Sequence, residues 1–226
     1  MRHGLRAATR PLSIGSMDKI SENAARLAGP ILAAPQKGAR KIVALAGPPA
    51  AGKSTLADAL AGHLSELGTP AQVVPMDGFH LDNRLLDELG LRERKGAPQT
   101  FDVTGFGRLL DGIAANSPTY FPVFDRSRDI AIAGAAKLHD DTQIVVVEGN
   151  YLLYDAPHWR DLVVHWDVSI WLDVPLPDLK ERLVARWVSY GMTPKAALSK
   201  AQANDLANAR EVQQNLLPAT FKIDNQ

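Results

Sequence analysis

The segment that constrains the fold most is GPPAAGKS, at residues 47–54. It matches the pattern G-x-x-x-x-G-K-[S/T], in which loop amides and the start of a helix surround a phosphate chain. KIVALA, at residues 41–46, precedes it and is typical of a short, buried parallel strand. The residues that follow have helical spacing that ends at Gly68. The order of strand, loop and helix therefore predicts a nucleotide-phosphate site in an α/β protein.

The residues of this loop indicate which of its groups bind phosphate and Mg2+. Pro48 and Pro49 have no amide hydrogen, so the amides that hold phosphate must come from residues 50–55. We expect the Lys53 ammonium to contact the β- and γ-phosphates and the Ser54 hydroxyl to complete the coordination of Mg2+. The predicted ATP-binding set is Gly47, Ala50, Ala51, Gly52, Lys53, Ser54 and Thr55.

Further apolar runs alternate with helical patterns along the chain. Strands are predicted at 71–76, 143–149, 168–174 and 219–223, and helices at 81–89, at 104–115 and between 175 and Gly191. The charged stretch PVFDRSRD at 122–129 is interpreted as a turn-rich loop. Strands separated by helical crossovers favour a parallel sheet with helices on both faces. We predict an α/β P-loop NTPase fold, a three-layer sandwich of about five parallel strands with a helical lid.

Length and composition suit one domain. The chain has 226 residues, of which 46% are hydrophobic and 22% charged, as is usual for globular proteins. We expect a single domain at 17–226, with an amphipathic helical segment at 17–40 and the core at 41–226. Residues 1–16 carry three arginines and no acid, and we expect them to be a disordered leader, with an organelle-targeting peptide as the alternative.

The charge balance and the lack of cysteine exclude several classes of function. Twenty-five Lys and Arg residues match twenty-five Asp and Glu residues, so the broad positive field that nucleic-acid binding needs is missing. The absence of cysteine excludes disulfides, thiolate nucleophiles and Cys-ligated zinc and is compatible with a reducing compartment. No apolar run reaches the roughly 18 to 20 residues of a membrane span. We expect a cytoplasmic protein without nucleic-acid or membrane partners.

Acidic residues stand at the ends of two predicted strands. Asp77 follows the strand at 71–76, and Glu148 ends the aliphatic run 144–147. Because parallel strands present their carboxyl ends at one edge, both acids are predicted to face the phosphate loop. Asp77 could accept the proton of an acceptor hydroxyl or simply cap a turn. Glu148 is predicted to lie near Mg2+, since a charge there needs a cation, water or a partner.

Two arginines share one face of the predicted helix after residue 175. Arg182 and Arg186 are four residues apart, so both could reach charge that develops on a transferred phosphoryl group. Alternatively, Asp178 could pair with Arg182 on an ordinary solvated face. The predicted catalytic set is Asp77, Lys53, Arg182 and Arg186.

Several segments together resemble the uridine kinase, pantothenate kinase and phosphoribulokinase superfamily. They are GPPAAGKST, MDGFH, RKGAPQTFD and EGNYLL, and the likeness runs in order from about residue 41 to residue 220. RKGAPQTFD is similar to the acceptor-side loop of bacterial pantothenate kinases. PMDGFHLDN, PVFDR, VVVEGNYLL and NDLANA resemble a bacterial subgroup named nucleoside/nucleotide kinase family or fructose-transport-system kinase.

The resemblance implies an ATP- and Mg2+-dependent kinase in which Asp77 is the catalytic base and Arg182 and Arg186 contact phosphates. A homodimer is a family-level expectation. The turn at 122–129 differs from the acceptor segments of both uridine kinases and pantothenate kinases, so neither substrate is assigned. The predicted acceptor-binding set is Asp77, Phe79, His80, Phe101, Asp102, Asp125, Arg126 and Tyr151.

The function expected from these features is transfer of the γ-phosphate of ATP to a hydroxyl of a small molecule, a fructose-type sugar or a nucleoside. Three alternatives stay open: a pantothenate-type kinase, a P-loop switch or assembly ATPase, and a binding module without catalysis. A switch would give Asp77 and the loop around Asp102 no clear task.

Overall fold

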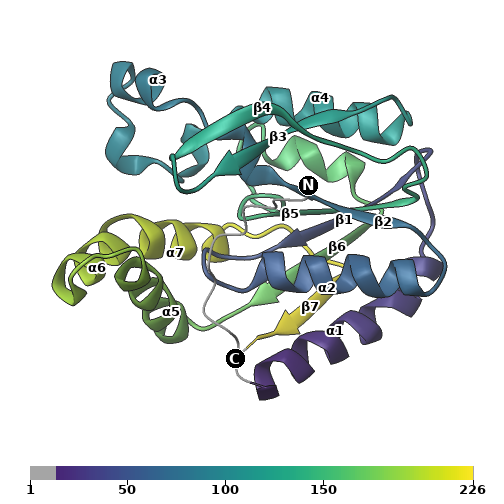
Figure 1. The fold of residues 1–226 in the computed structure, drawn as a ribbon, viewed down its shortest axis with the longest axis horizontal. Coiled ribbons are helices and arrows are strands. Elements are labelled where there is room, and N and C mark those ends of the chain that lie inside the picture. The colour runs from purple at the N-terminus through teal and green to yellow at the C-terminus, as the bar shows by residue number, and fades with distance from the viewer. Residues whose placement is uncertain (1–13, 226) are drawn as a thin grey trace, which may run out of the picture.

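The computed structural model describes residues 14–225 (Figure 1). Its centre is one parallel sheet of five strands in the order β2-β5-β1-β6-β7. The strands are β1 (Lys41–Ala46), β2 (Ala71–Pro75), β5 (Ile144–Gly149), β6 (Val168–Asp173) and β7 (Phe221–Asp224). Every residue of β1 and β5 is buried, as expected of apolar strands that are covered on both faces. The predicted sheet is confirmed.

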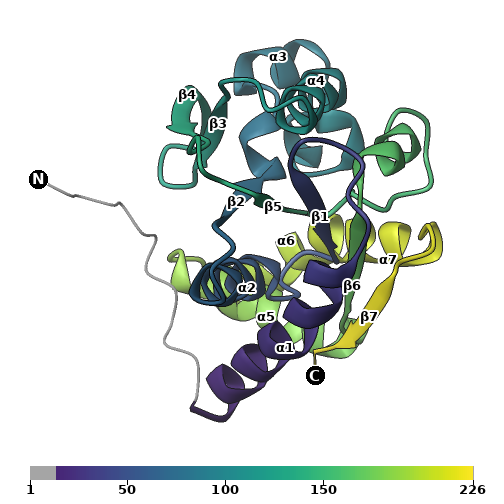
Figure 2. The ribbon, with the colours of Figure 1, turned by 90° about the vertical axis from the view of Figure 1, so that its right-hand side faces the viewer.

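Helices cover the two faces of the sheet, which gives three layers (Figure 2). Val43 and Leu45 share a core with α1 (Ile14–Ala33) and α2 (Lys53–Glu66). Ile42 and Ala44 share the opposite core with α4 (Val103–Ala114) and the 3-10 helix η4 (Arg160–His165). The alternation follows from the two-residue period of a strand. Together with the sheet, it confirms the predicted three-layer sandwich.

Three helices and a π-helical turn follow β6 and lie beyond the carboxyl ends of the strands (Figure 1). They are α5 (Leu176–Ser189), α6 (Pro194–Lys200), η5 (Ala201–Asp205) and α7 (Leu206–Gln214). We call residues 176–214 the lid segment. Gly191, with φ of +90°, follows the end of α5, as a left-handed position that ends a helix requires. None of the helices within residues 14–225 has the length and apolar character of a bilayer span.

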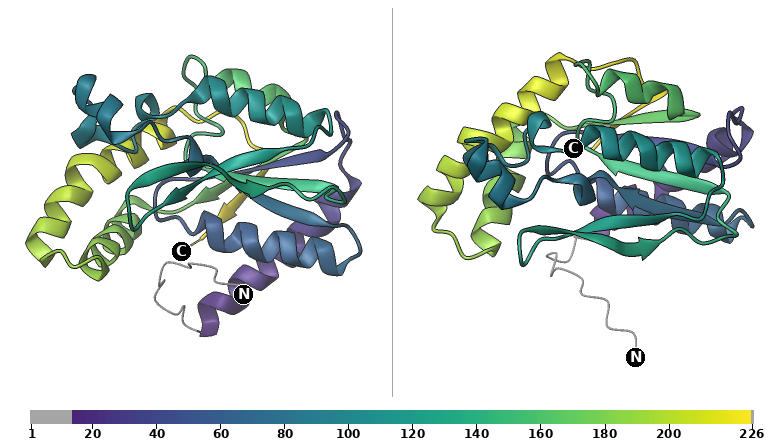
Figure 3. Two further views of the ribbon diagram at one scale, coloured as in Figure 1. Left: turned by 45° about the horizontal axis from the view of Figure 1, so that its top comes forward. Right: turned by 90° about the horizontal axis from the view of Figure 1, so that it is seen from above.

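A β-hairpin lies apart from the main sheet. Its strands are β3 (Tyr120–Asp125) and β4 (Ile130–Lys137), and the edge strand β2 contacts it through Gln72, whose amide nitrogen donates to the Lys137 carbonyl at 2.9 Å (Figure 3). The interpretation of 122–129 as a loop was therefore incomplete: residues 126–129 are the turn between these strands. A register shift beside Pro122 and the exposure of much of β4 weaken the alternation that would have revealed the hairpin.

The N-terminal helix is fixed to the central strand by a buried lysine. The Lys41 ammonium donates to the carbonyls of Ile31, Leu32 and Ala34 at 2.8, 3.0 and 2.7 Å. A cation at the carboxyl end of a helix satisfies carbonyls that have no partner within the helix. Because α1 starts at Ile14, it includes residues 14–16 of the predicted leader, whereas residues 1–13 lie outside the described part of the chain.

Candidate active site

The loop between β1 and α2 is shaped as a concave row of amides. Ala50 and Gly52 have positive φ angles of +64° and +93°, immediately before α2 starts at Lys53. Such reversals of backbone hand turn successive N–H groups towards one centre, where an anion binds. A Cβ on Gly47 would lie 2.9 Å from the Leu172 carbonyl, so glycine is required at the loop entry. The loop has the backbone that phosphate binding needs.

Lys53 is held inside this loop. Its side chain is largely buried, since the residue is only 7% exposed, and its ammonium donates to the Pro48 carbonyl at 2.9 Å and to Asn150 Oδ1 at 2.7 Å. Burial lowers its pKa to about 8, against the opposing effect of Glu148 and Asp77. A buried ammonium gains when an anion enters beside it. The geometry suits Lys53 to a phosphate chain, as its predicted role requires.

A hydroxyl and a carboxylate meet below the loop. Ser54 Oγ donates to Glu148 Oε1 at 3.2 Å. Burial and the nearby Asp77 raise the pKa of the Glu148 carboxyl, so a divalent cation here would relieve an unfavourable environment. Within residues 14–225, no cluster of three or more His, Cys, Asp or Glu forms a metal site. Two protein ligands suit Mg2+, which keeps waters and substrate phosphates in its shell.

Asp77 lies across from these residues in the 3-10 helix η1 (Met76–Phe79), which directly follows β2. Its Oδ2 accepts a hydrogen bond from the Arg126 guanidinium at 2.6 Å. Burial by itself raises the pKa of Asp77, but the positive charges of Arg126, His80, Lys53 and Arg186 outweigh it, and the pKa lies below its usual value. The carboxylate is therefore ionised, as a general base must be.

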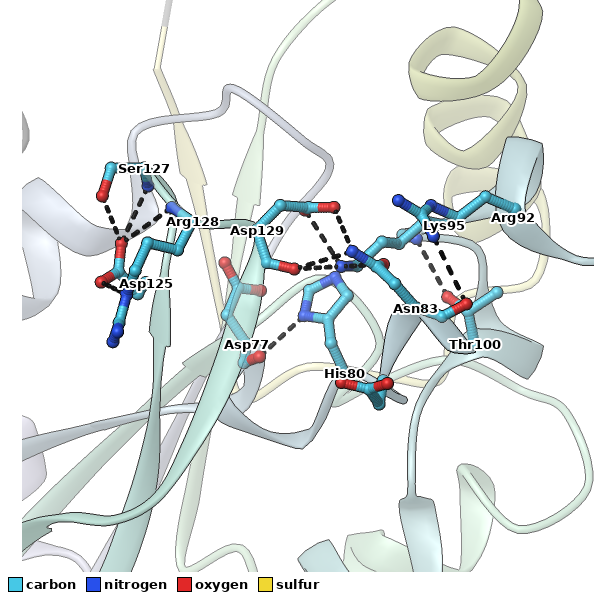
Figure 4. A network of polar contacts seen from close by, with 12 residues as sticks. Asp77, His80, Asn83, Arg92, Lys95, Thr100, Asp125, Ser127, Arg128 and Asp129 are labelled. Carbon is cyan, nitrogen blue, oxygen red and sulfur yellow. Dashed lines mark hydrogen bonds and ion pairs between the residues drawn. The ribbon is translucent and has the colours of Figure 1, made fainter. Parts of the chain in front are cut away.

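The turn that carries Arg126 is organised by its neighbour Asp125 (Figure 4). The Asp125 carboxylate accepts bonds from Ser127 Oγ at 2.6 Å, from Arg128 Nε at 2.8 Å and from the amides of both residues. These bonds, with that from Ser127 Oγ first, lower its pKa to about 2. Asp125 was predicted to bind the acceptor, but its carboxylate is taken up by its own turn. Only Arg126 reaches Asp77.

Gly78 fits where no other residue would. A Cβ built on Gly78 would lie 2.1 Å from the Pro122 carbonyl oxygen, so η1 and β3 are in direct backbone contact. We expect Gly78→Ala to lower the free energy of unfolding by about 1–3 kcal/mol or more, through overpacking, as measured by urea denaturation. Gly62→Ala is the control, because nothing lies within 4 Å of that Cβ and alanine favours a helix. Equal loss in both variants would contradict the close contact.

Aromatic rings lie next to Asp77. The His80 ring lies between Phe101 and Phe124, with centroid distances of 4.1 and 4.5 Å, and its Nδ1 contacts the Asp77 carbonyl oxygen at 2.7 Å. Phe79 packs on Phe106 at 5.0 Å. Burial lowers the pKa of His80, although the carboxylate of Asp77 opposes this shift. His80 and Phe101 thus lie on the predicted acceptor side.

Two other residues of the predicted acceptor-binding set form hydrogen bonds that support the fold. Tyr151 has no exposed surface, and its hydroxyl donates to the Gly96 carbonyl at 2.6 Å, so it supports the loop that contains Gly96 and offers no surface to an acceptor. Asp102 caps α4 by accepting from the Gly105 amide at 2.8 Å. Asp102 also borders a cavity of about 460 Å³ that Phe101 and Glu211 line but Asp77 and Lys53 do not. That cavity is separate from the reacting groups.

The two arginines of α5 have different surroundings. The Arg186 guanidinium pairs with Asp205 at 3.4 Å, and its buried Nε has no hydrogen-bond partner among residues 14–225. Its charge acts on both Lys53 and Asp77. Arg182 instead donates to the carbonyl of Asn225 at 2.9 Å, and the Asn225 amide donates to the Ala51 carbonyl at 2.8 Å. Arg186 thus faces the site, whereas Arg182 lies beside the loop, and among the described residues it does not pair with Asp178.

Sequence reasoning missed four residues of this site. Asn150, Asp205 and Asn225 hold Lys53, Arg186 and the phosphate loop in the bonds given above, and Lys95 contacts the turn of the hairpin. Asn150 follows Glu148 closely enough for the strand-end argument to have included it. Lys95 and Asp205 lie in RKGAPQTFD and NDLANA, which the sequence singles out only as whole segments, and their individual contacts depend on tertiary packing. Asn225 follows the terminal strand, and no local pattern marks it.

Comparison with known proteins identifies the family. The model of the Phosphoribulokinase / Uridine kinase family matches residues 42–184. The uncharacterized protein YggC of Escherichia coli is 38% identical over 82% of this chain and 78% of its own length. Protein C227.14 of Schizosaccharomyces pombe, named as a candidate uridine kinase, is 31% identical over 79% of this chain and 80% of its own length.

Among solved structures, a candidate fructose transport system kinase from Silicibacter sp. TM1040 is 52% identical, with a TM-score of 0.86 over 88% of this chain and 98% of its own. The region matched by the family model includes the phosphate loop, η1, the hairpin and the start of the lid segment. The family model and these relatives together show that this chain belongs to the phosphoribulokinase and uridine kinase family of P-loop kinases.

Proposed function

We propose that the chain transfers the γ-phosphoryl group of ATP to a hydroxyl of a small molecule, either a fructose-type sugar or a nucleoside. One observation carries the proposal. The ionised carboxylate of Asp77 lies where the positive charges of Lys53 and Arg186 both act on it, while Arg126 bonds its Oδ2 at 2.6 Å. A phosphate loop alone would not need a second, hydroxyl-activating carboxylate.

The reaction follows from the positions of these groups. The acceptor oxygen forms a bond to the γ-phosphorus as the bond to the bridging oxygen of ADP breaks, and the hydroxyl proton passes to Asp77. Lys53 and Arg186 balance negative charge on the transferred group. Ser54 and Glu148 would hold Mg2+, which supplies further charge neutralisation between the phosphates. The chain's own residues supply binding, orientation and the proton acceptor.

The names of two relatives support the choice of acceptor. One is named for a fructose transport system and the other for uridine. Both acceptors carry hydroxyls and apolar ring faces. The partly exposed rings of His80 and Phe124, which pack on each other with centroids 4.5 Å apart, offer apolar surface on which such a face could pack.

A screen of acceptors tests the proposal. ADP formation from Mg-ATP would be followed with sugars, nucleosides and pantothenate, each against a reaction without acceptor. We expect ADP only when a hydroxyl acceptor is present, with one phosphate ester formed per ADP. Removal of the divalent cation with EDTA should stop the reaction, because two protein ligands alone do not neutralise the phosphates. ADP formation at the same rate without any acceptor would instead favour an ATPase.

A further inference from the structure

The charges around Asp77 restrict the kind of acceptor. We infer that the acceptor is an uncharged polyhydroxy compound, and that sugar phosphates, nucleotides and carboxylated acceptors such as pantothenate are excluded. The inference rests on the proposed function, since it names the class of molecule whose hydroxyl meets Asp77. It depends on the fact that the cations framing the acceptor side already have partners.

The hairpin turn supplies two of these cations. Arg126 pairs with Asp77 at 2.6 Å, and Arg128 pairs with Asp125 at 2.8 Å. Arg126 is 46% exposed, so it is within reach of a ligand. If it turned towards an anion on the acceptor, however, the half-buried Asp77 carboxylate would lose its nearest counter-charge. Leaving one member of such a pair unpaired is strongly unfavourable.

The loop that faces the hairpin supplies a third cation, Lys95 (Figure 4). Its ammonium pairs with the Asp129 carboxylate at 3.0 Å and donates to Asn83 Oδ1 at 2.6 Å and to the Asp129 carbonyl at 2.7 Å. It also lies 5.0 Å from the centroid of the Phe124 ring, and its side chain is only 12% exposed. Lys95 is thus fully engaged, beside the rings that form the acceptor side.

The remaining cations of this loop are also committed. Arg92 pairs with Asp87 at 3.1 Å. Arg94 pairs with no carboxylate of the described residues, but its guanidinium donates to the Ala203 carbonyl at 3.2 Å and to Asn208 Oδ1 at 3.1 Å in the lid segment. Lys53 and Arg186 belong to the proposed phosphate-binding part of the site, where the negative charge of ATP would balance them. Within residues 14–225, every cation on this loop and on the hairpin turn is therefore engaged.

A neutral polyol meets no such conflict. In the described part of the chain, no side chain bonds Asp77 Oδ1, so this oxygen can receive the acceptor hydroxyl while Oδ2 keeps Arg126. Further hydroxyls can share the hydrogen bonds of the turn, and the carbon face of the acceptor can pack on the aromatic rings. An added negative charge would face Asp77, Asp125 and Asp129 without a free cation. Repulsion of this kind discriminates between acceptors that are otherwise alike.

The test compares neutral acceptors with charged partners of nearly the same shape. The pairs are fructose and fructose 6-phosphate, uridine and uridine 5′-monophosphate, and pantothenol and pantothenate. We expect the pair that contains the preferred acceptor to show kcat/KM at least about 10-fold higher for its neutral member. A higher kcat/KM for the charged member would overturn the inference and leave the proposed kinase activity standing.

One variant should shift this preference in a known direction. Asp129→Asn removes the negative charge that pairs with Lys95, and asparagine accepts the φ of +55° found at this position. We expect the ratio of kcat/KM for the charged over the neutral member to rise about 3- to 10-fold, because the charge of the Lys95 ammonium is no longer balanced by a carboxylate. Asp140→Asn is the matched control, since Asp140 pairs with Lys137 at the far end of the hairpin and should not change the ratio.

The outcomes separate the two claims. An unchanged ratio in Asp129→Asn would show that Lys95 does not set the preference and would overturn the inference. If no acceptor in either class stimulates ADP formation and Asp77→Asn leaves the basal rate unchanged, the proposed function fails and the inference fails with it. Both claims are supported if the native chain prefers the neutral member and if the kcat/KM ratio rises in Asp129→Asn but not in Asp140→Asn.

Discussion

Asp77→Asn should lower kcat for phosphoryl transfer by about 10²- to 10⁴-fold, the usual contribution of a positioned general base. Asparagine has nearly the same shape but cannot accept the hydroxyl proton. KM for ATP should change little, because the bonds of Lys53 and Ser54 do not involve Asp77. The measurement is acceptor-dependent ADP formation with the best acceptor of the screen, with initial rates taken at saturating ATP.

A matched variant separates catalysis from a general effect of charge. Asp82→Asn removes a carboxylate five residues further along, where Asp82 caps α3 (Asn83–Glu88) by accepting from the Arg84 amide at 3.0 Å. Asparagine caps helices as well as aspartate does, so kcat should stay within about 2-fold of the native value. If Asp77→Asn kept a tenth or more of the native kcat, Asp77 would not be the base.

Lys53→Met should remove most activity without loss of stability. The variant deletes the ammonium that faces the phosphates, and kcat/KM for ATP should fall by about 10²- to 10³-fold, as when one preorganised donor is removed. The native side chain is a buried charge whose pKa is lowered to about 8 chiefly by burial. Its replacement by an apolar chain of similar length relieves this desolvation and so offsets the loss of its bonds to the Pro48 carbonyl and to Asn150 Oδ1. We therefore expect the Tm to be unchanged or higher, in a thermal denaturation experiment without nucleotide.

Lys41→Met should have the opposite effects, a loss of stability without a loss of activity. Lys41 is also buried, but its ammonium bonds the three carbonyls at the end of α1, far from the reacting groups. Its loss leaves these acceptors without a partner and should lower the free energy of unfolding by about 1–3 kcal/mol, with kcat per folded molecule retained. A fall in Tm for Lys53→Met as large as that for Lys41→Met would mean that Lys53 is structural.

Much of the fold could be predicted because its signals are local. The strands β1 and β5 contain uninterrupted apolar runs, at 42–46 and 144–147, and β6 has only Ser169 between its apolar residues before it ends at Asp173. Such runs are typical of strands in a sheet that is covered on both faces. The loop at 47–54 is recognised by glycine spacing and by its position between strand and helix. The strand-end rule then placed Asp77 and Glu148 at the same edge as this loop, and the structure brings them together through Lys53 and Ser54.

What could not be predicted depends on contacts between distant segments. Arg126 and Asp77 are 49 residues apart, and a charged turn alone does not reveal which of its residues points outward. Asp125 and Arg126 are adjacent, yet one carboxylate is taken up locally and one guanidinium crosses to η1. Tyr151 follows the predicted strand and was a candidate for acceptor binding, but the aromatic core buries its side chain completely. Such differences are set by packing and not by residue type.

Arg94 and Lys95 are neighbours in the chain, yet they hold opposite parts of the molecule. The Lys95 side chain holds the hairpin turn, while its carbonyl accepts from Asn204 and the Arg94 guanidinium bonds Asn208, both in the lid segment. A substrate that orders one of these parts also orders the short loop that the other part needs. Any gain in acceptor affinity produced by bound ATP must then equal the gain in ATP affinity produced by bound acceptor, because thermodynamic linkage is reciprocal.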